Sequence, residues 1–377
     1  MNRSFLSIAL IAMLLCPFLG RAQVVDSTPA DSVPKPTKKP NLVQRFSRWR
    51  DRAQTSGFDS GYVAYPVNYR WQAQVYNNMS MDNVFLHMPN VMNLGSCDVF
   101  SSTGLHGKAS AGLYFRGWGL GFGKSFTRDV PDINLSLSSY GRVLGFELKL
   151  AANTSLRSAM RWVLPDTSMW YRPQANNDST GPENILLELN LYYIFNNRKF
   201  SYDAALTQFT WQTKSAGSVI GGLSFHASNI NYNNTLFAEF YYADTMEFLT
   251  HNLLFGLGYA YNWVYGGGKW MIHASVLPRV RYSYYRRMTL HPMGDMGHWS
   301  EDTRNYYYQN KAEMEHYARA NTLSLSAMVR LAFLWNISER WVTGLVGTAS
   351  GYGDGGFTGL SIVTFNWNVY LYGGFRF

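Results

Sequence analysis

The chain ends on a segment in which apolar and polar side chains alternate up to the last residue. From Val363 to Phe377, every second position is apolar or glycine, and most positions between them carry polar or tyrosine side chains. Because successive side chains of a β-strand point to opposite faces, this pattern predicts a strand with one apolar face. A strand that reaches the final residue is expected where it must pair with the first strand and close a sheet into a barrel.

Other segments of the chain repeat this alternation over about the ten residues of a membrane strand. The clearest apolar rows lie within residues 185–195, 253–263 and 323–335. Aromatic residues crowd both sides of three short polar connections, as in an interfacial girdle, at residues 196–199, 265–269 and 336–340. Charged residues make up only 15% of the chain, against roughly 25% in soluble domains. Lipid is therefore expected to cover much of the surface.

The first residues are typical of a secretory signal peptide, predicted at 1–22. Arg3 precedes an apolar run from Phe5 to Leu15, and small residues follow near Ala22. Beyond this segment no apolar run reaches about 18 residues, which excludes a spanning helix. A membrane protein of this sequence must then be a closed β-barrel. Cys97 would be the one cysteine of the mature chain, so no intramolecular disulfide is expected.

Residues 23–58 are predicted to be a periplasmic segment ahead of the barrel. Prolines and lysines give residues 23–40 the composition of an extended linker. In residues 41–53, Val43, Phe46 and Trp49 recur at helical spacing among arginines, which predicts a short basic amphipathic helix. Three positions suit such a helix: on an anionic leaflet, inside the barrel as a plug, or packed at its base.

The barrel is expected over residues 59–377, as an all-β, antiparallel transmembrane structure. Counting alternating short and long connections back from the last strand gives about fourteen strands, if residues 132–151 form two strands hinged at residues 140–142. A bulge at that hinge, with another merged pair, gives about twelve. The short connections are expected on the periplasmic side. Long connections are expected on the outer side, at residues 79–104, 153–184 and 284–320.

One stretch carries a more specific signal. "YIFNNRKFSYDAALTQFTWQTKSAGSVIGGLSF" (Tyr193–Phe225) resembles an uncharacterised domain-of-unknown-function family of outer-membrane barrels from Bacteroidetes-type bacteria. The matching residues are Phe195, Asn196, Lys199, Phe200, Ser201, Tyr202, Gln212, Ser215, Ala216, Gly217, Ser218 and Gly221. Blocks at residues 59–69 and 117–123 extend the resemblance over 59–377, with a departure at Gly61. The resemblance implies the barrel fold and the outer membrane of a Gram-negative cell, and it brings no established activity.

The strand faces opposite the apolar rows should line the lumen, where basic side chains outnumber acidic ones. The predicted lumen set is Arg70, Lys108, Arg116, Lys124, Glu147, Lys149, Glu188, His273, Arg279, Arg281, Arg330 and Arg376. The candidates for contacting a solute are Glu147, Lys149, Glu188, His273, Arg279, Arg281 and Arg330. Because arginine rings favour anions, one interpretation is a passive channel or ligand-binding barrel with a net cationic lumen. The other is a structural barrel whose charges pair and fill a closed interior.

An enzyme is the alternative function. A barrel-embedded lipid hydrolase or acyltransferase needs serine and histidine within hydrogen-bond reach, with a third group that orients the imidazole. His273 and Ser275 lie two residues apart on one inward face, and Glu188 is the candidate third group. Such spacing also arises by chance in any serine-rich strand. The sequence therefore favours a protein without catalytic residues.

The remaining motifs indicate which partners to expect. His291, His298 and His316 follow no ligand spacing, so neither a metal nor another cofactor is predicted. Basic residues are dispersed, which argues against a nucleic-acid partner. Phe375 and Phe377 resemble the C-terminal aromatic signal that outer-membrane assembly machinery recognises. The expected partners are thus outer-membrane lipid, the barrel-assembly machinery and a small-molecule ligand that the sequence leaves unidentified.

Overall fold

The structure of the protein is a computed structural model. It describes residues 57–65, 69–91, 95–126, 133–153, 157–163, 168–171, 184–233, 242–318, 322–355 and 361–377. The predicted signal peptide and basic helix lie outside the described residues, as does all but the end of the predicted periplasmic segment.

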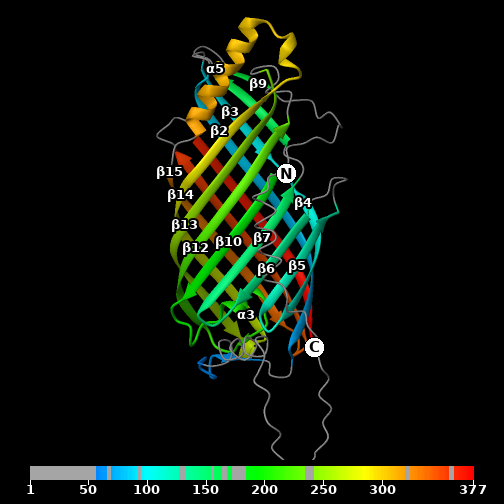
Figure 1. Ribbon diagram of the computed structural model, residues 1–377. Helices are drawn as coiled ribbons and strands as arrows, with labels where there is room; N and C mark the ends of the chain where they lie inside the picture. The colour runs from blue at the N-terminus through cyan, green and yellow to red at the C-terminus, as the bar shows by residue number, and fades with distance from the viewer. Residues whose placement is uncertain are drawn as a thin grey trace, which may run out of the picture. The chain divides into compact units, whose positions relative to one another are not determined.

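Among the described residues, a closed 12-strand antiparallel sheet forms the barrel (Figure 1). Its strands are β2 (Trp71–Val91), β4 (His106–Phe115), β5 (Trp118–Ser125), β6 (Ile133–Tyr140), β7 (Leu144–Asn153), β10 (Asn184–Ile194), β12 (Ala216–Asn233), β13 (Ala243–Tyr265), β14 (Trp270–Pro292), β15 (Thr322–Asn336), β16 (Trp341–Gly355) and β17 (Ser361–Arg376). β17 pairs with β2, and Phe377 and Trp71 exchange backbone hydrogen bonds of 2.9 and 3.0 Å. The terminal strand thus closes the barrel, as its alternation predicted.

The strand number is the lower of the two expected counts. The predicted hinge exists, because β6 and β7 pair on either side of residues 141–143. The estimate of fourteen was too high because each span was given about ten residues, whereas β13 and β14 contain 23 residues each. Alternation marks the face of a strand but does not limit its length.

The long connections expected at residues 79–104 and 284–320 are wrong in part, because strands extend into both. β2 continues to Val91 and pairs there with β3 (Gly95–Ser102), and β14 continues to Pro292. β8 (Arg157–Val163) and β9 (Ser168–Tyr171) extend this sheet beyond the barrel, within the region expected as the third long connection. Where the outward side chains of a strand are polar, the strand lacks the apolar row by which alternation is recognised in a sequence.

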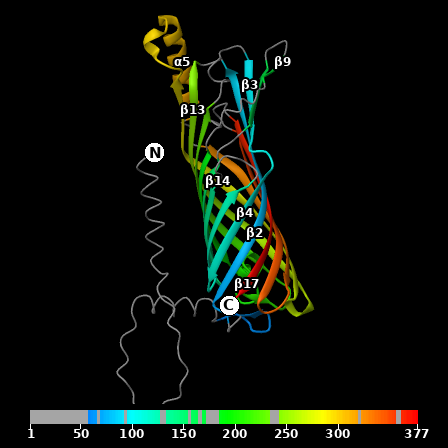
Figure 2. The ribbon, with the colours of Figure 1, turned by 90° about the vertical axis from the view of Figure 1, so that its right-hand side faces the viewer.

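A helix, α5 (Glu301–Ala318), follows β14 at the end of the barrel opposite the C-terminus (Figure 2). Tyr307 anchors it, because this buried side chain donates a hydrogen bond of 2.7 Å from its hydroxyl to the Leu290 carbonyl. None of the helices in the described ranges is long and apolar enough to cross a membrane. We call this end of the barrel the α5 end.

The barrel wall is apolar outside and polar inside. Along β15 the burial of side chains alternates, with Leu325 76% exposed and the neighbouring Ser324 8% exposed. Exposed apolar side chains follow the same rule on β13 and β17, as the sequence rows predicted. Aromatic pairs such as Trp270 and Trp335, stacked at 4.6 Å, lie beside the short connections. A contiguous apolar belt of this kind is typical of barrels whose outer surface is covered by lipid.

The connection between β10 and β12 folds into the barrel, which corrects the short turn expected at residues 196–199. Its residues 200–212, here called the plug, include α3 (Tyr202–Leu206) and β11 (Trp211–Gln212). The Ser201 hydroxyl caps α3 by accepting a hydrogen bond of 3.1 Å from the Ala204 amide. β11 pairs with β1 (Val63–Ala64), so the chain just before the barrel contacts the plug. α3 lies within the end of the barrel near the C-terminus, here called the α3 end (Figure 1).

A glycine in the connection between β13 and β14 fits the plug closely. Gly268 has a φ of +99°, and a Cβ there would lie 2.2 Å from Trp211 Nε1, which donates a 2.6 Å hydrogen bond to the Gly268 carbonyl. We expect Gly268→Ala to lower the free energy of unfolding by about 1–3 kcal/mol, from backbone strain and displacement of the indole. Urea unfolding in detergent, followed by tryptophan fluorescence, measures this change.

The neighbouring glycine provides the matched control. Gly267 has a φ of +66°, and a Cβ there would meet nothing within 4 Å. Gly267→Ala therefore introduces backbone strain without a steric clash and should destabilise the protein less. Equal losses for the two variants would contradict the contact between Gly268 and Trp211.

Candidate functional site

The plug packs into the α3 end of the lumen with an apolar core. Its side chains pack against strand residues from most of the barrel wall, in a cluster of Tyr140, Tyr192, Ile194, Ala216, Ile220, Ala260, Met271, Leu277, Met328, Ala332, Leu334, Val342, Val346 and Tyr372. Phe200 and Phe209 of the plug are fully buried. On the β2 side, the Gln72 and Gln74 amides donate hydrogen bonds of 2.8 and 2.9 Å to the Thr207 carbonyl. The plug is thus bonded to the wall as well as packed against it.

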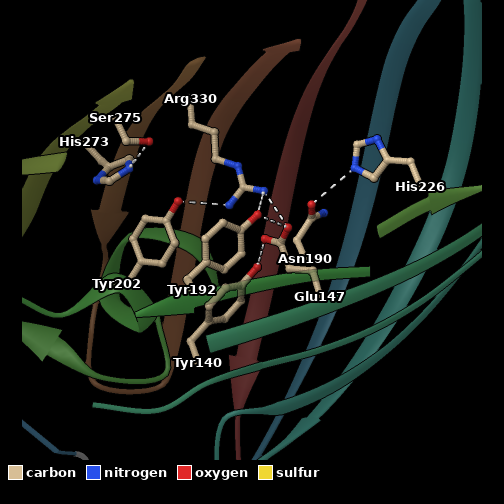
Figure 3. Close-up of polar contacts among 9 residues, drawn as sticks. All are labelled: Tyr140, Glu147, Asn190, Tyr192, Tyr202, His226, His273, Ser275 and Arg330. Atoms are coloured by element: carbon tan, nitrogen blue, oxygen red, sulfur yellow. Dashed lines mark hydrogen bonds and ion pairs between the residues drawn. The ribbon is translucent and has the colours of Figure 1, made fainter. Parts of the chain in front are cut away.

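The predicted pair His273 and Ser275 lies against the plug, whose Phe200 and Tyr202 rings contact the His273 ring. His273 Nε2 is 3.2 Å from Ser275 Oγ (Figure 3). Its Nδ1 is 2.6 Å from Asn262 Oδ1. Asn262 therefore orients the imidazole. The prediction that Glu188 would be this third group was wrong. The Asn262 amide also donates to the Ser201 carbonyl at 3.0 Å and to Gln212 Oε1 at 2.7 Å. Because His273 is fully buried, this network holds the plug rather than facing a substrate.

A buried ion pair crosses the lumen beside α3. Arg330 Nη2 lies 2.6 Å from Glu147 Oε2, with side chains 8% and 18% exposed (Figure 3). Tyr192 donates to the same carboxylate at 2.8 Å, and Tyr140 donates to its other oxygen. Arg330 Nη1 donates to the Tyr202 hydroxyl at 3.1 Å, which ties the ion pair to the plug. Buried charges persist only when they are paired and hydrogen-bonded, and this pair meets both conditions.

A polar cavity of about 310 Å³ lies next to the plug. Leu206 and Thr207 of the plug form part of its wall, and it extends to Lys108 and Asn134 near the ends of the short strands β4 and β6. A volume of this size is at the lower end of the roughly 300–1,000 Å³ typical of small-molecule sites. The cavity is therefore the candidate binding site.

The cavity brings together most of the candidate residues. Glu147, Lys149, Glu188, Arg279 and Arg330 line it. His273 and Arg281 are absent from its wall. Arg281 is held away from it by a 2.7 Å hydrogen bond to Asn252 Oδ1 and by the Tyr352 ring, whose centroid is 3.7 Å from the guanidinium carbon.

The wider lumen prediction was wrong for three basic residues. Lys124 is exposed on the outward row of β5, with Leu120 and Phe122. Arg70 and Arg116 lie outside the strands at the tip of the β4–β5 hairpin, where the Arg116 amide donates a 3.0 Å hydrogen bond to the Arg70 carbonyl. The phase of β5 was misassigned because glycine fills the inward positions 119, 121 and 123 and leaves no side-chain pattern there.

Uncharged polar residues make up much of the cavity wall. The predicted lumen set did not include them, because it was chosen from charged residues and histidine. The uncharged residues include Tyr76, Asn78, Tyr114, Tyr140, Asn190, Asn368 and Tyr370. Each lies on an inward row that the sequence alternation identifies. A search of those rows for tyrosine and asparagine, in addition to charges, would have found these residues.

Beyond the cavity, a group of apolar side chains lies in the lumen near the α5 end. The side chains of Leu86, Ile230, Met246, Phe248, Met288 and Ile362 are buried there. A space of about 20 Å³ remains among them. The polar cavity thus lies between the plug and these apolar side chains. Among the described residues, no three histidine, cysteine, aspartate or glutamate side chains converge as metal ligands.

A family model decides where this chain belongs. The model of a domain of unknown function, DUF4421, matches residues 183–377, more than half of the chain. This chain belongs to the DUF4421 family. The matched region contains Tyr193–Phe225, so the resemblance seen in that stretch is confirmed, and in this DUF4421 protein that stretch contains the whole plug. The blocks at residues 59–69 and 117–123 lie outside the match, and their resemblance stays a prediction.

Three solved structures with a similar fold are distant in sequence from this DUF4421 barrel. The outer membrane protease OmpT from Escherichia coli is 5% identical, with 85% of this chain and 100% of that chain covered and a TM-score of 0.37. A bacterial polysaccharide outer membrane secretin is 10% identical over 82% and 99% of the two chains, at 0.31. The P. putida toluene transporter TodX is 8% identical over 87% and 99%, at 0.24. No curated protein matches the sequence.

Proposed function

We propose that this chain is an outer-membrane β-barrel that binds a small solute in a lumen closed at its α3 end. The observation that carries the proposal is the plug, whose residues 200–212 are almost all buried inside the barrel. An open passive channel needs a continuous water-filled path, and the complete burial of Phe200 and Phe209 in the plug argues against one at that end. The cavity beside the plug is the proposed binding site for this solute.

Placement in an outer membrane rests on the barrel and on sequence signals together. The apolar belt around a closed sheet fits lipid, and a closed barrel is the one β-structure that spans a bilayer. The predicted signal peptide and the terminal Phe377 fit export and recognition by barrel-assembly machinery. A Gram-negative, Bacteroidetes-type origin is part of this proposal, as are outer-membrane lipid and the assembly machinery as partners.

We also propose that the lumen carries a net positive charge, as the sequence predicts. Among the described residues that are buried inside the barrel or line its cavity, the basic ones are Lys108, Lys149, Arg279, Arg281, Arg286, Arg330 and Arg376. The acidic ones are fewer: Asp82, Glu147, Glu188 and Asp203. An excess of positive charge should draw anions into any pore that is opened through the lumen. The enzyme alternative gains no support, because His273 and Ser275 are buried against the plug and outside the cavity.

Two measurements on the purified mature protein test the proposal. A lipid-embedded barrel should migrate differently on detergent gels before and after heating, and it should show no steady current in planar bilayers. A protein that stays monodisperse in buffer without detergent would contradict the membrane placement. A steady ionic current from the native protein would contradict the closed lumen.

A further inference from the structure

Three polar groups that line the cavity have atoms without a hydrogen-bond partner in the protein. They are Nε of Arg279, Oδ1 of Asn78 and Oδ1 of Asn368. Arg279 is only 4% exposed, and its Nη2 donates to Ser326 Oγ at 3.1 Å, so the guanidinium is fixed in place. Buried polar atoms of this kind are rare unless a ligand or water satisfies them.

These groups come from separate parts of the wall. Asn78 lies on β2 and Asn368 on β17, and the register places them as diagonal neighbours, since Asn368 pairs with Ser80 and Asn78 with Tyr370. Arg279 lies on β14, which is separated from β17 by β15 and β16. The three side chains that carry one unpartnered donor and two unpartnered acceptors therefore line one cavity, from two separate parts of its wall.

Several charged groups of the cavity wall already lie beside a group of opposite charge. Arg330 is paired with Glu147 at 2.6 Å. Lys149 and Glu188 are direct cross-strand partners on β7 and β10. A ligand with a net charge would have to compete with these pairs, and burying a charge without a partner is costly. The wall thus favours a neutral ligand.

A hydroxyl group is neutral, and it can bond both to the unpartnered donor and to the unpartnered acceptors, because it donates one hydrogen bond and accepts others. A carboxylate or phosphate accepts but cannot donate to the two asparagine oxygens, and an ammonium group donates but cannot accept from Arg279. We propose that the cavity binds a small, neutral, polyhydroxylated molecule such as a mono- or disaccharide or a cyclitol. The tyrosines of the wall give such a molecule aromatic surface to pack against. This inference rests on the proposed ligand-binding function.

Calorimetric titration of the full mature protein in detergent tests the ligand class. The probes are glucose, maltose and myo-inositol, with glucuronate and glucosamine as charged counterparts that keep most of the hydroxyl groups. We expect at least one neutral probe to bind, and the charged counterparts to bind about tenfold or more weakly, because a charged ligand would have to compete with the charges already placed beside one another in the wall. Tighter binding of glucuronate or glucosamine than of glucose would overturn the neutral class. Heat from none of the five probes would also overturn it and would indicate that water alone fills the cavity.

Two adjacent asparagines on β2 provide a matched pair of variants. Asn78 faces the lumen, whereas Asn77 is exposed on the outward face. Asn78→Leu should weaken binding about tenfold or more by removing an acceptor, and Asn77→Leu should leave it unchanged. Equal weakening by both variants would contradict a site in the cavity. Failure of the ligand class remains distinct from failure of the proposed function, because the latter appears as a steady current in the bilayer recording.

Discussion

Deleting residues 199–214 should turn a barrel with a closed lumen into one that conducts ions. The deletion removes the plug but keeps Asn196, whose amide donates a 2.8 Å hydrogen bond to the Gly217 carbonyl, so β10 and β12 can still join through a short hairpin. The apolar core at the α3 end loses its central side chains, and water can enter there. We expect the current in planar bilayers at a given voltage to rise roughly tenfold or more above that of the native protein.

The selectivity of the opened barrel tests the charge of the lumen. With basic residues in excess, the reversal potential in a KCl gradient should show a preference for chloride over potassium. A preference for potassium would contradict the net cationic lumen, even if the pore opens.

A deletion of equal length outside the lumen serves as the control. Removing residues 301–316 takes most of α5 from the opposite end of the barrel and leaves the plug intact. This variant should remain closed. If both deletion variants keep heat-modifiable migration and neither conducts, the plug is not what closes the lumen.

The second large effect is expected at the ion pair between Arg330 and Glu147. Arg330→Met leaves the carboxylate buried, with tyrosine hydroxyls as its remaining partners, and should lower the free energy of unfolding by about 3–5 kcal/mol. Glu147→Gln leaves the guanidinium uncompensated and should have a similar effect. Urea titration in detergent, followed by tryptophan fluorescence, measures both losses.

The double variant shows whether the two residues act as a pair. Because removing both charges leaves neither one uncompensated, the combined loss should be smaller than the sum of the single losses by about 1–3 kcal/mol. Arg340→Met is the control, since Arg340 is exposed in the turn between β15 and β16 and should change stability by at most about 0.5 kcal/mol. Additive losses for Arg330 and Glu147 would contradict a direct interaction.

Local periodicity explains how much of the fold could be predicted. A period of two fixes which side chains of a strand face lipid, so the rows of β13, β15 and β17 and the short turns at residues 265–269 and 336–340 follow from sequence order alone. The hinge between β6 and β7 was visible for the same reason, because the apolar phase changes there. The strand number could not be predicted in the same way, because nothing in the alternation marks where a long strand such as β14 ends.

The candidate site was predicted only in part. Glu147, Arg279 and Arg330 were found because charged residues stand out on an inward row. Asn262 was missed because its role depends on the position of the plug, and Asn78 and Asn368 were missed because amides are common on every polar face. For Asn262 the missing information was a contact between residues that are distant in sequence.

The sequence by itself determined that this protein is a closed barrel with an apolar outer face and a polar inner one, because side-chain alternation is a property of neighbouring residues. Only the tertiary structure decided that the barrel has twelve strands, that residues 200–212 enter its lumen and that a cavity remains beside them. The physical reason is that the plug is stabilised by packing against side chains from strands spread around the ring, and these side chains come together only when the ring closes.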